Sequence, residues 1–307
     1  MKKREVAILI PCYNEAKTIT KVINDYKKAL PEATIYVYDN NSIDGTDKLA
    51  KKAGAKVKYE YRQGKGNVIR SMFRDINADA YLIIDGDDTY PAEDANKMIK
   101  LVLDNKADMV IGDRLSSTYF KENKRFGHNF GNKLVRNLIN SLFNSKVQDI
   151  MTGYRAFSYE FVKSFPVLSR GFEIETEMTI HALDKNLKLK EVPVQYRDRP
   201  EGSESKLNTT SDGIKVLLKI FNMVREFRPM LFFNLFSLIS LVIGIIFMFI
   251  PTIEFFETGL VTKFPTLIVG VLFIIISLLL WITGLICDLI AKKFRQLFEI
   301  NMNILRK

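Results

Sequence analysis

Three polar motifs in this sequence follow apolar runs of the kind that form buried strands. They are Asp85–Asp88 (DGDD), Pro11–Glu15 (PCYNE) and Asp39–Thr46 (DNNSIDGT). Two carboxylates one residue apart can bind a hard divalent cation such as Mg²⁺ or Mn²⁺ and leave positions for diphosphate oxygens. Because Asp and Gly are also common in surface turns, Asp85 and Asp87 indicate a metal site only together with the other motifs.

The companion motifs carry the polar groups that a nucleotide needs. Carboxylates can bind a base, side-chain oxygens can bind ribose hydroxyls, and backbone N–H groups can bind phosphate. A further motif, Gly64–Gly66 (GKG), opens a predicted helix. It is not a dinucleotide fingerprint, because Ile69 stands where the third glycine would be. We therefore expect one nucleotide site built from several short motifs.

A parallel sheet would bring these motifs together. Short apolar runs predict strands at Val6–Ile10, Thr34–Tyr38, Val57–Tyr59, Tyr81–Ile84 and Met109–Ile111. Helical patterns alternate with them at Thr18–Leu30, Thr46–Ala53, Asn67–Ile76 and Ala92–Leu103. This alternation predicts a doubly wound α/β sheet with mostly parallel strands. Ligands of such sheets bind at the carboxyl ends of the strands, which is where the motifs occur.

The composition changes near residue 229. Two uncharged apolar stretches follow, Leu231–Ile250 and Thr266–Cys287, each near the ~20 residues that cross a ~30 Å hydrocarbon core. Buried core helices are the alternative, although these seldom run that long without a polar face. Lys and Arg flank the pair, whereas Glu254, Glu257 and Lys263 lie between the stretches. The positive-inside rule then predicts a multi-pass cell-membrane protein with its N-terminal domain and tail in the cytoplasm.

These boundaries predict three parts: a cytoplasmic α/β domain over residues 1–208, a juxtamembrane amphipathic helix over 209–228, and a membrane domain over 229–307 that ends in a basic tail. Apolar residues recur at helical spacing in His128–Phe143 and Ser211–Phe227. Each segment could lie in the membrane interface or face an ordinary core.

Charge and cysteine content narrow the partners. Lys and Arg number 45 against 35 Asp and Glu, a net charge of +10. This suits a phosphate-bearing ligand, an anionic membrane, nucleic acid or solubility alone. No RNP-like motif, helix-turn-helix or basic stripe with aromatics occurs, so we expect no nucleic acid. Neither Cys12 with Cys287 nor His128 with His181 has zinc-ligand spacing, and a reduced compartment is favoured.

The motifs PCYNE, DNNSIDGT, GKG and DGDDTYP together resemble the family-2 inverting glycosyltransferases with a GT-A fold. The motifs GDR at 112–114, DIMTGYR at 149–155 and RDRPEGSESKL at 197–207, with a two-helix tail, are similar to the polyprenyl-phosphate branch. That branch includes dolichol-phosphate mannose synthases and bacterial undecaprenyl-phosphate glycosyltransferases. The resemblance spans essentially the whole chain.

The resemblance implies a reaction and its partners. A sugar would pass with inversion from a nucleotide-sugar, UDP-N-acetylglucosamine or UDP-glucose, to a polyprenyl phosphate such as undecaprenyl or dolichyl phosphate. The product would serve cell-surface glycan assembly, and the cofactor would be Mg²⁺ or Mn²⁺. A GDP-mannose donor and a non-catalytic membrane scaffold stay open as alternatives, as does a homo-oligomer. A processive synthase is disfavoured, because the Q-x-x-R-W motif is absent and the only tryptophan is Trp281.

The resemblance also assigns residues. The nucleotide would be held by Pro11, Tyr13, Glu15, Asp39 and Lys65, and the metal with the diphosphate by Asp85 and Asp87. The acceptor phosphate would be surrounded by Arg114, Arg199, Ser205 and Lys206. Asp149 occupies the position of a base or of a residue that orients the substrate, with support of the following loop as the alternative. Asn40 stands where relatives often have a second Asp, and Thr89 where many have Gln. Among Glu173, Glu175 and Glu177, mostly solvated or structural roles are expected, though one could reach the sugar.

Overall fold

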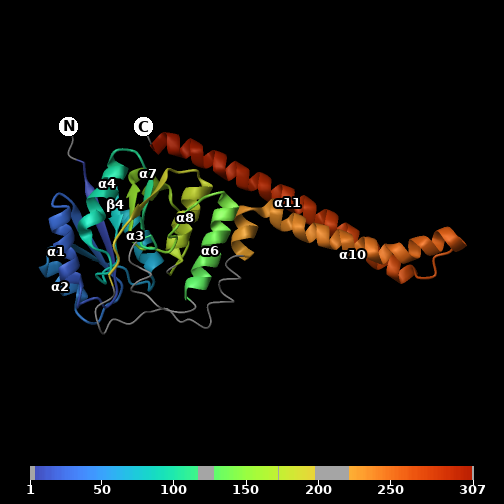
Figure 1. Ribbon diagram of the computed structural model, residues 1–307, viewed down its shortest axis with the longest axis horizontal. Coiled ribbons are helices and arrows are strands. Elements are labelled where there is room, and N and C mark those ends of the chain that lie inside the picture. The colour runs from blue at the N-terminus through green and yellow to red at the C-terminus, as the bar shows by residue number, and fades with distance from the viewer. Residues whose placement is uncertain (1–3, 117–127, 172, 198–220, 306–307) are drawn as a thin grey trace. The chain divides into compact units, whose positions relative to one another are not determined.

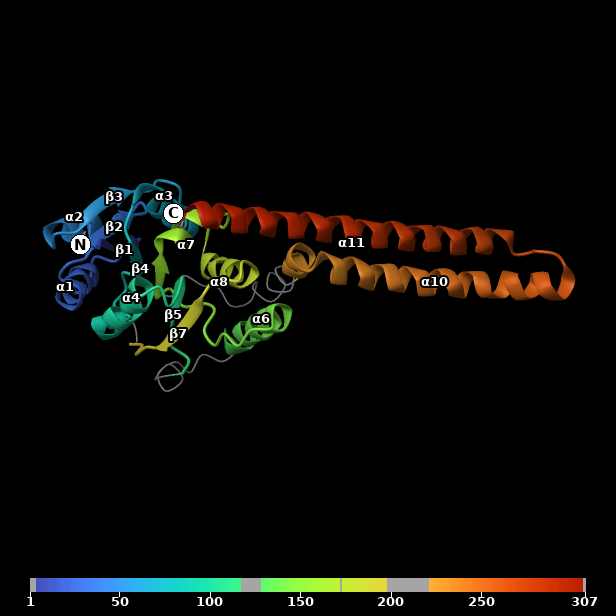
Figure 2. The ribbon, with the colours of Figure 1, turned by 90° about the horizontal axis from the view of Figure 1, so that it is seen from above.

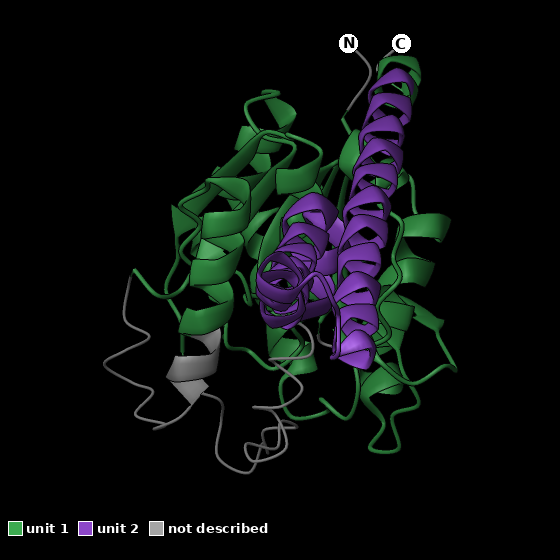
Figure 3. Ribbon diagram, turned by 90° about the vertical axis from the view of Figure 1, so that its right-hand side faces the viewer, with its two compact units in different colours: residues 1–209, 301–307 green, residues 210–300 purple. Residues whose placement is uncertain are grey.

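The structure is a computed structural model that describes residues 4–116, 128–171, 173–197 and 221–305 (Figure 1). It divides into two compact units, residues 1–209 with 301–307, and residues 210–300 (Figure 3). The first unit contains the α/β sheet and the second contains two long apolar helices. The predicted boundary at residue 208 lies outside the described residues and stays a prediction.

A seven-stranded sheet with the order β3-β2-β1-β4-β6-β5-β7 forms the first unit. Its strands are β1 (Val6–Cys12), β2 (Thr34–Asp39), β3 (Lys56–Tyr59), β4 (Ala80–Ile83), β5 (Met109–Asp113), β6 (Arg155–Ser158) and β7 (Leu189–Pro193). Only β6 is antiparallel to its neighbours, β4 and β5, and every other pair is parallel. The prediction of a mostly parallel α/β sheet is confirmed.

Helices cover both faces of this sheet. The described helices of this unit are α1 (Ile19–Ala29), α2 (Thr46–Lys52), α3 (Lys65–Asp75), the 3₁₀ turn η1 (Ala92–Asp94), α4 (Ala95–Leu103), α6 (His128–Phe143), α7 (Tyr159–Ser164) and α8 (Ile174–Asp184). In Figure 2, α1 and α4 lie on one side of the strands and α3 and α7 on the other. Side chains of successive strand residues point to opposite faces. Accordingly, Ile8 and Ile10 join the core with α1 and α4, while Phe157 of β6 contacts Phe73 of α3 and Phe161 of α7.

Strand β6 is the main element that the sequence did not predict. Its four residues begin with Arg155, whose side chain is fully buried. The guanidinium donates to the carbonyl oxygen of Thr152 at 2.9 Å and to Thr179 Oγ1 at 2.9 Å. Burial lowers the pKa of Arg155 to about 10. A strand that is short and starts with a charged residue gives no apolar run, so periodicity cannot reveal it.

The second unit consists mainly of α10 (Pro229–Thr258) and α11 (Phe264–Leu305). Both helices are long and apolar enough to cross a membrane, by length and composition. Small residues pack them together: Ser237 Oγ donates to the carbonyl oxygen of Ser277 at 2.9 Å, and a Cβ added at Gly244 would lie 3.0 Å from the carbonyl oxygen of Gly270. Close backbone approach through Gly and Ser is typical of paired helices in lipid.

Both helices run beyond the predicted stretches. The predicted outer loop began near Glu254, but α10 continues to Thr258, and Gly259 caps it with φ of 71°. The connection between the helices is therefore confined to residues 259–263. Of the predicted juxtamembrane helix, residues 221–227 are helical, and residues 209–220 lie outside the described residues.

Candidate active site

The first two motifs are tied to each other at the carboxyl ends of the neighbouring strands β1 and β2. The backbone N–H of Asn14 donates to Ser42 Oγ at 2.9 Å, and the N–H of Ile43 donates to Asn14 Oδ1 at 2.9 Å. The N–H of Glu15 donates to Thr46 Oγ1 at 2.9 Å. Segments about thirty residues apart in sequence thus form one surface, as the parallel sheet predicted.

Acidic side chains from three motifs gather around Cys12, the last residue of β1. Burial raises the pKa of its thiol, and so do the carboxylates of Glu15, Asp39, Asp85 and Asp87. Gly86 permits this approach, since a Cβ there would lie 2.9 Å from Cys12 Sγ. The predicted nucleotide and metal residues are therefore brought together. Pro11 lies within β1, and Tyr13 follows it with 36% of its surface exposed.

Asp39 ends β2 and is 4% exposed. Its Oδ2 accepts a hydrogen bond from the N–H of Ser42 at 3.0 Å. Its Oδ1 is buried without a hydrogen-bond partner in the part of the chain that the structure describes. An unsatisfied buried carboxylate oxygen is costly unless a ligand donates to it. This oxygen is suited to accept an N–H of a nucleobase.

Asn40 makes contacts that an aspartate could not make. Its Nδ2 donates to the carbonyl oxygens of Glu60 at 2.6 Å and Arg62 at 3.0 Å. Its Oδ1 accepts from the N–H of Gly64 at 2.8 Å. An amide can donate and accept at once, whereas a carboxylate only accepts. The departure from the common Asp-Asp pair therefore has a structural cause: Asn40 fastens the loop between β3 and α3 to the end of β2.

We expect Asn40→Asp to lower stability and weaken nucleotide binding. The carboxylate would face two carbonyl oxygens without donors, which should cost about 2 kcal/mol. The midpoint of thermal unfolding and the affinity for UDP, measured by calorimetry, report the two effects. Asn41→Asp is the matched control, because Asn41 is exposed and donates to Tyr61 and Gln63 at 3.0 and 3.1 Å. Equal midpoints for the two variants would contradict the assignment.

The glycines of Gly64–Gly66 contact protein. The N–H of Gly64 binds Asn40, and the N–H of Gly66 donates to the carbonyl oxygen of Arg170 at 3.0 Å. A Cβ at Gly66 would lie 2.2 Å from the carbonyl oxygen of Ser169. The N–H groups of Gly64 and Gly66 are therefore used within the protein. These glycines let α3 pack against the backbone at residues 169–170.

Lys65 lies between two carboxylates. Its Nζ is 2.6 Å from Asp85 Oδ1 and 2.7 Å from Glu175 Oε1. Burial lowers the pKa of Lys65, but Asp85 and Glu175 outweigh it and raise the pKa overall, so the ammonium stays charged. Lys65 was expected near the nucleoside, and this stays a prediction. In the structure its ammonium places a positive charge beside Asp85, a predicted metal ligand.

Glu175 is a functional candidate that the sequence placed, with Glu173 and Glu177, in a mostly solvated or structural set of which one could reach the sugar. It is 4% exposed, and its Oε2 is buried with no hydrogen-bond partner among the described residues. Glu175, Thr176, Met178 and Thr179 of α8 are all buried, so no amphipathic pattern marks the inward-facing positions. Its carboxylate lies beside the Lys65–Asp85 pair with one oxygen available to accept from a ligand.

Thr89 orients Asp87. Its Oγ1 and N–H donate to Asp87 Oδ1 at 2.6 and 3.2 Å, and both residues are buried. Within residues 4–116, 128–171, 173–197 and 221–305, no group of three or more His, Cys, Asp or Glu side chains could hold a metal ion. Asp85 and Asp87 provide two carboxylates one residue apart, which leave coordination positions for diphosphate oxygens and water. Carboxylate oxygens suit Mg²⁺ or Mn²⁺.

Arg114 follows β5 and forms a two-pronged ion pair with Asp149. Its Nε is 2.7 Å from Asp149 Oδ2, and its Nη2 is 3.1 Å from Oδ1. Asp149 is 2% exposed, and Glu191 Oε1 accepts from its N–H at 3.3 Å. Because both carboxylate oxygens contact Arg114, the geometry favours an orienting duty for Asp149 over that of a base. Arg199, Ser205 and Lys206 lie outside the described residues.

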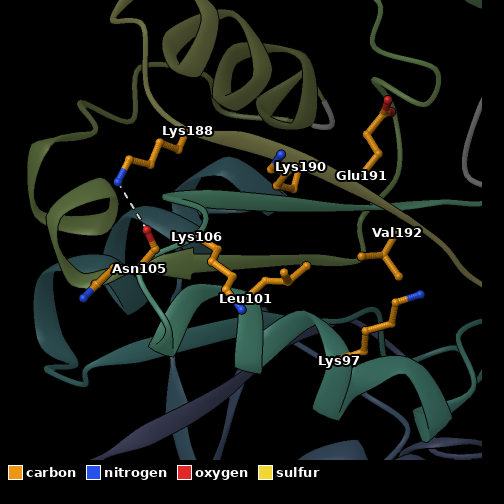
Figure 4. Close-up of a pocket in the computed structure, with 8 residues that line it drawn as sticks. All are labelled: Lys97, Leu101, Asn105, Lys106, Lys188, Lys190, Glu191 and Val192. Carbon is orange, nitrogen blue, oxygen red and sulfur yellow. Dashed lines mark hydrogen bonds between the residues drawn. The ribbon is translucent and has the colours of Figure 1, made fainter.

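A cavity of about 640 Å³ lies elsewhere, along α4 and the edge strand β7 (Figure 4). Its lining is rich in lysine: Lys97, Leu101, Asn105, Lys106, Lys188, Lys190, Glu191 and Val192. None of the predicted site residues lines it. Lysines on an edge strand also discourage pairing with other strands, which explains them without a ligand.

A family model, Glycosyl transferase family 2, matches residues 7–165. This chain belongs to that family. Glycosyltransferase AglJ of Haloferax volcanii is 36% identical to this glycosyltransferase over 230 residues, which are 75% of each chain. The dolichyl-phosphate hexose transferase of Haloferax volcanii is 28% identical over 224 residues, 73% of this chain and 96% of the relative. These relatives fit the predicted polyprenyl-phosphate branch.

The fold of this family-2 glycosyltransferase also matches solved structures. Glucosyl-3-phosphoglycerate synthase of Mycobacterium tuberculosis, crystallised with Mn²⁺, UDP-glucose and phosphoglyceric acid, has a TM-score of 0.58 and 21% identity. The match covers 71% of this chain and 79% of that one. It confirms the GT-A fold.

Proposed function

We propose that this family-2 glycosyltransferase transfers a sugar from UDP-N-acetylglucosamine or UDP-glucose to a polyprenyl phosphate, with inversion. The observation that carries the proposal is the placement of two groups at the carboxyl ends of the sheet strands. Asp85 and Asp87 follow β4, and Arg114, which binds Asp149, follows β5. The aspartate pair suits a metal-bound diphosphate, and the arginine suits a phosphate. Two membrane-length helices and a relative named for dolichyl phosphate support a lipid acceptor.

The donor is inferred from two unsatisfied oxygens. Asp39 Oδ1 would accept the imide N–H of uracil, and Glu175 Oε2 would accept a hydroxyl of the sugar. The solved neighbour holds UDP-glucose, which supports a uridine nucleotide. Guanine also presents N–H donors, so GDP-mannose is the competing donor.

Charge on the leaving group would be balanced by the metal and by Lys65. Asp85 and Asp87 would hold Mg²⁺ or Mn²⁺, which as a Lewis acid offsets negative charge on the departing diphosphate. Lys65, kept charged by Asp85 and Glu175, adds a fixed positive charge at the same place. The neighbour's Mn²⁺ supports this proposal.

A phosphate oxygen of the lipid would form a bond to the anomeric carbon as the bond to the diphosphate oxygen breaks and UDP departs. A single displacement inverts that centre. The second pKa of a phosphate monoester is about 6, so the acceptor is already largely dianionic and needs no strong base. The Arg114 guanidinium, fixed by Asp149, matches phosphate oxygens with its planar fork.

A substrate panel tests this function. Purified enzyme in detergent is given undecaprenyl phosphate with UDP-N-acetylglucosamine, UDP-glucose or GDP-mannose, and the lipid product is identified by mass spectrometry. We expect product with a UDP-sugar and a β-linkage by NMR. Product only with GDP-mannose would support the competing donor. No product with any donor, despite UDP binding, would support the scaffold alternative.

We also propose that the catalytic unit is cytoplasmic and the α10–α11 connection is outside. Leu260→Cys, in that connection and 67% exposed, should react with an impermeant maleimide on intact cells. Lys293→Cys in α11, beyond the predicted stretch, should react only after permeabilisation. Cys287→Ser serves as the background for both variants. The opposite labelling pattern would overturn the orientation and separate the site from cytoplasmic nucleotide-sugars.

A further inference from the structure

The third aspartate of the DGDD motif is bound by helix α1. Asp88 has φ of 61°, a left-handed conformation that few residues other than glycine adopt. Its Oδ1 and Oδ2 lie 2.7 and 2.6 Å from Lys21 Nζ. The backbone therefore turns this carboxylate toward α1, while Asp87, one residue earlier, is held by Thr89.

The same short segment binds the chain at Arg197. The N–H of Arg197 donates to the carbonyl oxygen of Thr89 at 2.9 Å. Its guanidinium lies 3.9 Å from Asp88 Oδ1 and 3.5 Å from Glu93 Oε1. In sequence, Arg197 begins the basic motif that carries Arg199 and Lys206. The residues directly after the metal pair thus hold the start of that motif.

Tyr196 connects this point to the predicted phosphate-binding arginine. The Tyr196 ring packs edge-to-face on Tyr90 with a centroid separation of 5.6 Å, and the Arg114 guanidinium carbon lies 5.5 Å from the Tyr196 ring centroid. Residues 196 and 197 therefore contact both the segment that follows Asp87 and Arg114. A displacement of Tyr196 or Arg197 would therefore change contacts both with the segment that follows Asp87, on the donor side, and with Arg114, on the acceptor side.

We propose that Asp88 is a positioning residue for the acceptor: with Lys21, it holds Arg197 on the segment that follows Asp87, and it thereby holds Tyr196 against Arg114. This inference rests on the proposed function. Asp88 is 15% exposed in its side chain, and Lys21 and Arg197 are 50% and 44% exposed. Ion pairs this exposed are individually weak, so the expected effect is about 3- to 5-fold.

The test separates acceptor use from donor use in the full-length enzyme. Asp88→Asn keeps the left-handed turn, which Asn tolerates, but removes the charge; Lys21→Met removes the cation from α1. We expect each to raise the KM for undecaprenyl phosphate about 3- to 5-fold. The kcat, the donor KM and Mn²⁺-dependent UDP binding by calorimetry should stay within about twofold. Asp25→Asn is the matched control, because Asp25 also pairs with Lys21, at 3.1 Å, within helix α1.

Hydrogen exchange provides a readout that needs no turnover. Peptides covering residues 189–197 should exchange faster in Asp88→Asn and Lys21→Met than in the wild type or Asp25→Asn. Unchanged acceptor KM and unchanged exchange would overturn the inference, and so would a selective loss of Mn²⁺-dependent UDP binding. If the wild type used no lipid phosphate while exchange still rose, the proposed function would fail and the anchoring of Arg197 would stand. Lys21→Met carries the test if Asp88→Asn does not fold.

Discussion

Asp87→Asn should lower the rate of sugar transfer about 10³-fold, equivalent to about 4 kcal/mol of transition-state stabilisation. Asp87 is 4% exposed, and its Oδ1 accepts from Thr89 Oγ1 at 2.6 Å. Asparagine can keep that contact and the shape of the turn, but it removes the negative charge that a divalent cation requires. Initial rates at saturating substrates measure the loss, and calorimetry of Mn²⁺ binding with UDP locates it at the metal.

Asp104→Asn is the matched control, since Asp104 is an exposed aspartate that follows α4 and pairs only weakly with Lys106 at 3.3 Å. Its activity and unfolding midpoint should equal those of the wild type. EDTA should silence the wild-type enzyme, and Mg²⁺ or Mn²⁺ should restore it. Full activity in EDTA, or an Asp87→Asn variant that binds Mn²⁺ and UDP normally, would contradict the assignment of Asp87 as a metal ligand.

The sheet and the meeting of its motifs were predictable because both are local in the sequence. Apolar runs of four to seven residues bounded by turns mark β1, β2 and β4. Parallel strands end at one edge, so residues that follow them must converge. The carboxylates of Asp39, Asp85 and Asp87 around Cys12 bear this out. Convergence follows from topology without knowledge of any side-chain contact.

Long-range pairing was not predictable. Lys65 and Glu175 lie 2.7 Å apart but more than a hundred residues apart in sequence, and although Lys65 lies in the GKG motif, no pattern in the sequence links it to Glu175. Arg155 is a similar case, because a buried guanidinium satisfied by carbonyl oxygens reads in the sequence as a surface charge. Such groups are set by the tertiary environment, which single-sequence periodicity does not contain.

The helix ends of the second unit were missed for a different reason. Hydropathy marks where residues prefer lipid, and helices continue beyond that point while backbone hydrogen bonding and local propensity allow. Thus α10 continues through Glu254 to Thr258, and Gly259, in the left-handed conformation, caps it. α11 likewise continues past Cys287 to Leu305 through charged residues. The apolar stretches were located correctly, but the lengths of the helices that contain them were underestimated.

Asp149→Asn should lower kcat/KM for the lipid phosphate about 100-fold, while donor binding changes little. Asp149 is buried and meets Arg114 through both of its oxygens, at 2.7 and 3.1 Å. Removing one charge of a buried pair costs about 2–5 kcal/mol in binding, much of it from the partner left without its counter-charge. Arg114 would then lose its fixed orientation, and its guanidinium would no longer be held in place to bind the oxygens of the acceptor phosphate. Steady-state kinetics with the acceptor varied measure the effect.

Asp108→Asn is the control for neutralising a buried aspartate near β5, because Asp108 is 8% exposed and binds the N–H of Lys188 at 2.7 Å. The double variant Arg114→Ala/Asp149→Asn should be no worse than Arg114→Ala alone, since the two residues act as one unit. A general base would behave differently. Its loss would lower kcat even at saturating acceptor and would remove the acidic limb of the pH profile of kcat. That result would make Asp149 the proton acceptor, and Arg114 would have to bind phosphate without an orienting partner.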